Sequence, residues 1–412
     1  MASPLRLAAA GALLATLLAA PSPAMAADST RFDVWSSTDE LARGASEGVK
    51  VANGKVVLDK PVGTLRWKDP YGSGATKTYE YGRWTSPWSS TGFDARTLVP
   101  SWTAIASSGS WIRVEVQVRN SSRTSTWDQV ADWTYGVSSV HRRSWPAQPD
   151  DLVDIDTDTV KATGSNRFSQ YRLRVYLYRP QGTTVTPTLY AVQGVAATYA
   201  TRSQPTSRTT MTRTTELAVP QYSQMTHRGH YPQYGNGGEA WCSPTSTAMV
   251  LRFWGKGPKA SDYSWEKGTD PWVDHAARYT YDYRYKGTGN WAFNTAYASM
   301  YGLWGYVSRF TDLRDAEGFI KAGVPVIAPL AWSKGGLTGA PISSTAGHLM
   351  VITGFEKNGD VIVNDPAASS NGTVRRVYQR AQFEKAWLGA SGGVAYLIHP
   401  GSTKLPANTG RW

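Results

Sequence analysis

Cysteine and histidine are scarce in this chain, and their scarcity excludes several kinds of site. The 412 residues contain one cysteine, Cys242, and six histidines. A single thiol cannot form an intramolecular disulfide, and it cannot supply a structural zinc site built from several thiolates. No uninterrupted apolar run approaches the roughly 20 residues that span a bilayer. No motif implies a metal or an organic cofactor, so we expect neither.

Charged side chains are also few, at 18% of residues against 41% hydrophobic residues, and the formal net charge is +12. The positive charge forms no basic stripe and accompanies no nucleic-acid motif, so a nucleic-acid partner is not expected. A mildly basic exported protein would be attracted to anionic cell-wall polymers. A solvated surface would account for the same charge equally well.

The first 26 residues are typical of an export signal. Arg6 provides the positive end, the stretch 7–20 is almost entirely apolar, and 24–26 reads Ala-Met-Ala, a small-x-small cleavage pattern. We place the mature start at Ala27 and expect a secreted, extracellular protein. An N-terminal anchor is the alternative, although the apolar run is short for one.

Residues 27–200 alternate between apolar and polar side chains in the manner of half-buried strands. The segments 112–119 and 171–177 show the clearest alternation. Clusters of Gly, Pro, Ser and Asp separate such segments, and no long stretch has helical periodicity. The pattern predicts an all-β, sandwich-like domain. Its tryptophans would form the core or stack on sugars of a cell-wall polymer: Trp84, Trp88, Trp102, Trp111, Trp127 and Trp133.

A Ser/Thr-rich segment, 201–215, follows and contains no acidic residue, which predicts a linker. Residues 216–412 then begin with helices and continue with strands, an order typical of an α+β domain. The expected helices are 245–254 and 316–322, and the expected strands are 324–330, 349–355, 361–363, 374–378 and 394–398. This change of pattern predicts separable domains. Packing of the β domain against the second domain is the alternative.

Cys242 directly precedes the expected helix 245–254. The amino end of a helix presents unsatisfied N–H groups and the positive end of the helix dipole. Both favour a thiolate over a thiol, and a thiolate is a nucleophile near neutral pH. We therefore expect Cys242 to be reactive, with a buried inert cysteine as the alternative.

A nucleophilic thiolate needs a base, and His348 is the strongest candidate because it opens the apolar strand 349–355. His227 and His230 lie on a Gly-rich approach to Cys242 and could be loop residues or substrate contacts. Asp365, at the end of the next strand, is the preferred acceptor for the imidazole, and Asn364 is the alternative. A tight turn between the strands would leave Asp365 about 13 Å from His348, whereas a wider loop would place the two opposite each other.

Together these segments resemble the peptidase C39-like family, and most closely its secreted actinobacterial members. The matching segments are 239–246 around Cys242, 289–291, 322–326, 347–351 around His348 and 364–366 around Asp365. The resemblance implies a papain-like fold, with a Cys-His-Asp triad formed by Cys242, His348 and Asp365. It also implies an oxyanion-hole glutamine, for which Gln224 is preferred over Gln221. Ser243 stands where many relatives have glycine after the cysteine.

The resemblance implies a cysteine peptidase or amidase that acts on a peptide or a cell-wall peptide. Two alternatives remain open from the sequence. The same triad could transfer an acyl group to an amine, as in a transglutaminase-like enzyme. The papain-like domain could instead be catalytically idle in a protein that binds a cell-wall polymer through its N-terminal domain.

Overall fold

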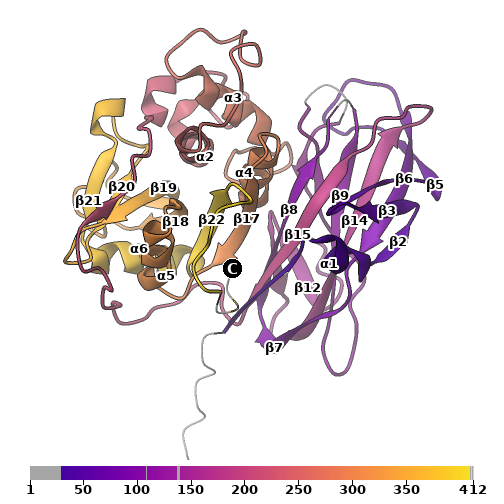
Figure 1. Cartoon of the computed structure of the whole chain (residues 1–412), viewed down its shortest axis with the longest axis horizontal. Coiled ribbons are helices and arrows are strands. Elements are labelled where there is room, and N and C mark those ends of the chain that lie inside the picture. Colours follow the sequence, from indigo (N-terminus) through magenta and orange to yellow (C-terminus); the bar gives the residue numbers. More distant parts are fainter. Residues whose placement is uncertain (1–28, 108, 137–139, 409, 411) are drawn as a thin grey trace, which may run out of the picture.

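The computed structural model describes residues 29–107, 109–136, 140–408, 410 and 412, so the expected export signal lies outside the described residues. Two domains lie side by side, and Figure 1 shows the indigo-to-magenta N-terminal domain beside the orange-to-yellow C-terminal domain. The first is mostly β and the second is a mixed α/β domain. Among the described residues, no helix has the length and apolar character that a membrane crossing requires.

The N-terminal domain consists of two antiparallel sheets and one short helix, α1 (Thr38–Ala42). One sheet contains β12 (Val153–Asp156), β13 (Thr159–Ala162), β8 (Thr97–Ile105), β15 (Thr188–Ala197), β4 (Lys55–Leu58), β3 (Val49–Ala52) and β1 (Thr30–Trp35). The other contains β11 (Arg143–Ser144), β10 (Asp128–Trp133), β9 (Trp111–Arg119), β14 (Phe168–Pro180), β6 (Lys77–Thr85), β2 (Ala45–Glu47), β5 (Gly63–Trp67) and β7 (Ser89–Ala95). The alternation in 112–119 and 171–177 correctly predicts β9 and β14, which pair with each other.

The tryptophans of this domain are mainly core residues. Four of the six candidates for sugar stacking are fully buried: Trp84, Trp102, Trp111 and Trp133. The other two are partly exposed, but arginines cover their rings. Arg119 lies 4.2 Å from the centroid of Trp88, and Arg174 lies 3.8 Å from that of Trp127. The stacking surface that the sequence suggested is therefore occupied by the protein's own side chains.

The C-terminal domain is built on one antiparallel sheet. Its strands are β17 (Trp304–Arg309), β22 (Val394–His399), β18 (Val326–Trp332), β19 (Thr345–Phe355), β20 (Val361–Asn364), β21 (Arg375–Tyr378) and β16 (Thr215–Glu216). Its helices are α2 (Cys242–Phe253), α3 (Pro271–Thr280), α4 (Trp291–Ser299), α5 (Leu313–Lys321) and α6 (Arg380–Ser391). Three short 3-10 turns complete it: η1 (Gln224–His227), η2 (Gly238–Ala240) and η3 (Asn371–Thr373). Sequence periodicity predicts α2, α5 and most of the strands but not α3, α4 or α6.

The segment 201–215 lies along the C-terminal domain and is held there by buried carboxylates. Glu384 accepts a hydrogen bond from the backbone of Ser207 at 2.7 Å, and Glu317 accepts one from the backbone of Thr210 at 2.8 Å. Arg202 is buried and donates to the carbonyl of Phe310 at 2.8 Å. Hydrogen bonds thus hold a segment that has little apolar surface of its own.

The two domains share a continuous apolar core, which supports packing rather than loose tethering. Phe293 of α4 contacts Trp133 and Trp102, with ring centroids 5.2 and 6.2 Å apart. Buried polar contacts reinforce the interface, because Arg142 of the β domain donates to the carbonyl of Arg278 at 2.9 Å. Figure 1 shows the same arrangement, with α4 and β17 facing β8.

Candidate active site

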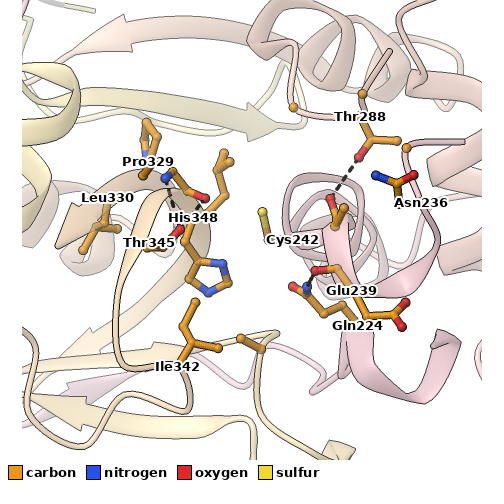
Figure 2. A pocket seen from close by; sticks show the side chains of 18 of the residues that line it. Gln224, Asn236, Glu239, Cys242, Thr288, Pro329, Leu330, Ile342, Thr345 and His348 are labelled. Atoms are coloured by element: carbon orange, nitrogen blue, oxygen red, sulfur yellow. Dashed lines mark hydrogen bonds between the residues drawn. The ribbon is translucent and has the colours of Figure 1, made fainter. Parts of the chain in front are cut away.

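Cys242 is the first residue of α2 and lies in a cavity of about 830 Å³ between the helices and the sheet. Trp241, which caps this helix, makes no side-chain capping bond, so the N–H groups of the first turn remain directed toward the thiol end. In Figure 2 the sulfur lies between His348 on one wall and Gln224 on the other. Cys242 is partly exposed as a residue and lines the cavity.

His348 projects from β19 into the same cavity and is 3% exposed. Its backbone pairs with Leu330 of β18, which fixes the height of the imidazole along the sheet. The indole of Trp332 packs edge-on against the imidazole, with ring centroids 5.8 Å apart. The imidazole is therefore held by the sheet below it and by an aromatic ring beside it.

Asp365 orients this imidazole from the end of β20. Its Oδ1 lies 2.7 Å from Nε2 of His348. Because Nε2 is engaged by the carboxylate, Nδ1 is the imidazole nitrogen that remains for the thiol.

The strand register that brings Asp365 to His348 lies between the two alternatives considered from the sequence. Val351 pairs with Asn364, so the next step places Asp365 beside Met350. A bulge between Ile352 and Gly354 produces this register. Met350 and His348 are two residues apart and share a face, so the carboxylate reaches the imidazole diagonally.

Asn364, the alternative acceptor for the imidazole, instead contacts the backbone of another segment. Its side-chain amide donates to the carbonyls of Val219 and Pro220, each at 3.1 Å. Successive strand residues point to opposite faces, so Asn364 faces away from the imidazole when Asp365 faces it. Its contacts hold the segment that leads to Gln224.

The electrostatics of the three groups favour a charged pair. Burial alone would raise the pKa of Cys242, but the influence of His348, together with nearby backbone N–H groups, lowers that pKa. Backbone N–H groups of Leu349 and Ser243 act on the thiol pKa in the same direction. Burial lowers the pKa of His348, whereas Asp365 and Cys242 raise it to a net value of about 10. These two opposite shifts favour a thiolate beside an imidazolium.

Two contacts that sequence reasoning missed hold the carboxylate in place. The hydroxyl of Tyr378 donates to Oδ2 of Asp365 at 2.7 Å, and the backbone N–H of Ala367 donates to Oδ1 at 3.0 Å. Burial favours the neutral acid, but His348 and these donors lower the pKa of Asp365. Tyr378 ends a predicted strand, and nothing in its spacing indicated that its hydroxyl faces Asp365.

Gln224 lines the cavity on the side of Cys242 opposite His348, and Gln221 is not among the residues of its lining. The Gln224 backbone N–H donates to the carbonyl of Pro366 at 2.9 Å, which ties its position to the segment that carries Asp365. Its side-chain nitrogen donates to the carbonyl of Glu239 at 2.7 Å. An amide nitrogen has two hydrogens, so this bond leaves the second hydrogen unused.

Family models match both halves of the chain. Residues 31–197 match the model described as Peptidase C39 N-terminal domain, and residues 216–395 match the Peptidase_C39 like family. The chain belongs to the peptidase C39-like family. At the level of the family, this membership supports a cysteine-peptidase-like hydrolase with a peptide substrate.

No curated protein matches this C39-like chain. Among solved structures, it is similar to a family two carbohydrate esterase from Cellvibrio japonicus, at 11% identity and a TM-score of 0.17. That match covers 54% of this chain and 50% of the esterase chain. A similarity this low carries no argument about fold or activity.

The serine that departs from the glycine of many C39-like relatives does not obstruct the cavity. Ser243 is fully buried, and its hydroxyl lies 3.0 Å from that of Tyr396 in the core below the cavity. Its backbone N–H remains beside the sulfur of Cys242, where it acts on the thiol pKa. The substitution therefore changes the packing beneath the site and leaves the thiol accessible.

His227 and His230 do not line the cavity; they flank Asp274 of α3. Their Nδ1 atoms lie 2.8 and 2.9 Å from the two carboxylate oxygens. The three side chains offer ligand atoms within 4.8 Å of one another, so they could hold a metal ion. The hydrogen bonds alone already satisfy the buried carboxylate and join η1 to α3.

Proposed function

We propose that this C39-like protein is an exported thiol hydrolase that cleaves peptide or amide bonds through Cys242, His348 and Asp365. The observation that carries the proposal is that Cys242 and His348 line one cavity while His348 is hydrogen-bonded to the fully buried carboxylate of Asp365. This cavity is large enough for a peptide segment. The helix that carries the cysteine and the strand that carries the histidine also support a papain-like arrangement.

In the first half-reaction the thiolate attacks the substrate carbonyl carbon, and a carbon–sulfur bond forms. The carbonyl oxygen becomes an oxyanion, which the backbone N–H of Cys242 and the side-chain amide of Gln224 stabilise. The His348 imidazolium then gives its proton to the leaving amine as the carbon–nitrogen bond breaks. The product of this step is a thioester on Cys242 and a free amine.

In the second half-reaction water attacks the thioester carbonyl while neutral His348 accepts a proton from it. The carbon–sulfur bond breaks, the acid product leaves, and the thiolate–imidazolium pair returns. Asp365 keeps the imidazole oriented in both steps. An amine in place of water would make the reaction an acyl transfer, and a cross-linked product with release of ammonia would identify it.

The rate of Cys242 alkylation by iodoacetamide tests the activated thiolate. We expect labelling near pH 7 to be faster than that of free cysteine, and we expect His348→Ala to slow it strongly and to abolish hydrolysis. His141→Ala, which removes an imidazole from the other domain, is the control and should keep the wild-type rate. Labelling no faster than that of free cysteine would contradict the proposal. If His230→Ala slowed labelling and His348→Ala did not, the imidazole would be wrongly assigned.

Export is the second part of the proposal, and it rests on the signal pattern of residues 1–26. Sequencing the amino terminus of protein collected outside the cell should show a start at Ala27. Full-length protein retained in the cell would contradict export without affecting the proposed chemistry.

A further inference from the structure

Three arginines of the β domain, Arg119, Arg172 and Arg174, form a row on the outer face of one sheet; we call them the arginine row. Arg119 ends β9, and the other two lie on β14, which pairs with β9. Arg119 is opposite Gln170, and residues 170, 172 and 174 point to one side of β14, so the three side chains share a face. All three are partly exposed. The C-terminal domain packs against the other sheet, through β8 and β15, and does not cover this face (Figure 1).

Two indole rings hold the guanidinium groups of the row. The centroid of Trp88 lies 4.2 Å from the guanidinium carbon of Arg119 and 4.6 Å from that of Arg172. The centroid of Trp127 lies 4.9 Å from that of Arg172 and 3.8 Å from that of Arg174. A planar guanidinium that stacks on a ring keeps its N–H groups in its own plane, so they can still donate to a ligand. Because these side chains are already held, a ligand that binds them costs less conformational entropy.

Arg119 and Arg172 have charges that no carboxylate balances. Neither forms an ion pair among the described residues; the Nε–H of Arg119 donates to the side-chain oxygen of Gln170, and that of Arg172 to Gln117. One Nη2–H of Arg172 donates to the same oxygen of Gln117, which leaves three of its five N–H groups for a ligand. Burial and the positive charges of Arg174 and Arg119 lower the pKa of Arg172, and no carboxylate is among the charges that act on it.

The same end of the sheet has two more arginines without a carboxylate partner. Arg123 follows β9 and Arg167 precedes β14, and each donates to an oxygen of Asn166. In the part of the chain that the structure describes, Glu115 is the one carboxylate in an ion pair with any of these five arginines, through Arg174 at 2.5 Å. This end of the sheet therefore has a local excess of positive charge, which is complementary to a polyanion.

The arrangement favours a chain of phosphate groups as the ligand. The planar fork of a guanidinium matches two oxygens of one phosphate. Neighbouring strands lie about 4.8 Å apart, and diagonal residues on them about 7–8 Å apart, so one extended chain with repeated phosphates can contact several of these arginines. Arginines lie over the rings of Trp88 and Trp127, so these rings do not offer the aromatic faces on which the bases of single-stranded nucleic acids stack.

We propose that the arginine row is a binding surface for an anionic polymer with repeated phosphate groups. The guanidinium groups would make the contacts, and the two tryptophans would support them without touching the ligand. The surface lies on the β domain and uses no residue of the Cys242 cavity, so the inference is independent of the proposed hydrolysis. It gives the β domain a role in holding the protein on a phosphate-rich polymer.

Binding of the chain 27–412 to fluorescently labelled linear polyphosphate, measured by polarisation at several salt concentrations, tests the surface. Arg119→Gln combined with Arg172→Gln should weaken binding at least about tenfold, because two charged hydrogen-bonding groups are lost. The slope of log K against log salt should become shallower by roughly one to two, because fewer counterions are released. Wild-type protein that does not bind polyphosphate at low salt would overturn the inference without any variant.

A control of equal charge distinguishes the row from the net charge of the protein. Arg83→Gln combined with Arg179→Gln removes two positive charges from the same sheet, but these arginines form ion pairs with Glu47 and Glu80. This double variant should keep nearly the wild-type affinity and slope. Equal losses in the two double variants would show that net charge alone attracts the polymer and would overturn the assignment to the row.

Two further measurements address the ligand class and a structural role. Polyacrylate, a densely charged chain of carboxylates, should bind more weakly than polyphosphate, and equal affinity would overturn the assignment to phosphate. Thermal unfolding reports whether the row only stabilises the sheet. A lowered melting temperature in Arg119→Gln with Arg172→Gln, with polyphosphate affinity and salt slope unchanged, would show a purely structural role and overturn the inference.

Discussion

At the scale of single residues, the opposite pKa directions of Cys242 and His348 define the activity that this site can have. Each partner stabilises the charged form of the other, and Asp365 adds to the charge that holds the proton on His348. The pair is therefore charged at pH values above the lowered thiol pKa and below the raised imidazole pKa. The proposed hydrolysis needs both members of the pair in these forms.

The pH profile of kcat/KM should follow from this pair. We expect a broad plateau, because the acidic limb lies below the usual thiol pKa and the basic limb approaches the His348 pKa of about 10. Asp365→Asn removes the negative charge that raises the imidazole pKa, so the basic limb should move to lower pH. Rates measured from acidic to strongly basic pH test this, and an unmoved basic limb in Asp365→Asn would contradict it.

Tyr378 is a positioning residue, because it acts on the imidazole only through Asp365. A hydrogen bond to a charged group contributes about 1.5–3 kcal/mol, so Tyr378→Phe should reduce kcat/KM by roughly tenfold or more. Its loss also removes a donor that lowers the pKa of Asp365, so the acidic limb that protonation of Asp365 produces, below that of the thiol, should move to higher pH. A purely structural role would lower the melting temperature and leave that limb in place.

Residue chemistry was more predictable from the sequence than residue contacts. The position of Cys242 before a helix and of His348 at the start of a strand predicted two reactive groups, and both residues line the same cavity. The meeting of His348 and Asp365 depends on a bulge near Thr353, which no periodicity marks. Tyr378 could not be assigned, because its role depends on the strand order of the folded sheet.

At the scale of helices and strands, the helices that the sequence did not predict show how burial on most sides hides helical periodicity. Most residues of α4 are buried, so it lacks the polar face that makes a helix recognisable in sequence. Helix α3 is amphipathic, but it begins abruptly at Pro271 after Asp270 in a left-handed conformation. The predicted strands fared better, because each is a short apolar run between turn residues.

The hydrogen bond from the backbone N–H of Trp291 to Asp158 couples helix α4 to the β domain and should make stability depend on pH. Burial raises the pKa of Asp158 from 3.8 to about 7. Between pH 3.8 and about pH 7 the carboxyl of Asp158 has lost its proton in the unfolded chain but retains it in the folded chain. The free energy of unfolding therefore falls as pH rises through this range. Asp158→Asn removes this titration, and the variant should lose less stability than wild type over that range, by roughly 4 kcal/mol at about 1.4 kcal/mol per pKa unit.

Denaturant unfolding at several pH values between 4 and 7 measures this difference. Asp154→Asn, on the β12–β13 hairpin that also carries Asp158 but with no contact to α4, is the control and should follow the wild-type curve. Identical pH dependence in wild type and Asp158→Asn would show that the carboxyl of Asp158 titrates as it does in the unfolded chain.

At the scale of the whole molecule, the interface between the domains determines whether either one is an independent unit. The Ser/Thr-rich composition of 201–215 indicated a linker, and it could not reveal that Glu317 and Glu384 hold the segment in place. Composition shows that the segment has little apolar surface of its own. The residues whose hydrogen bonds compensate for this are distant in sequence, so composition cannot reveal them. The same limitation concealed the shared core around Phe293.

The shared core predicts that the C-terminal domain does not keep its activity alone. A chain of residues 201–412, which retains the anchored segment, would expose Phe293 to water and lose the Asp158 contact to Trp291. We expect this chain to be insoluble or to label at Cys242 much more slowly than the full protein. Trypsin cleavage of the full protein within 201–215, in contrast, should leave the two parts associated on gel filtration, with the labelling rate retained.

Adding the β domain back tests whether the loss of labelling is a folding defect. Residues 27–200 co-expressed with 201–412 should restore solubility and iodoacetamide labelling, because the interface is apolar and needs no covalent link. A soluble chain of residues 201–412 that labels as fast as the full protein would show that the domains are separable.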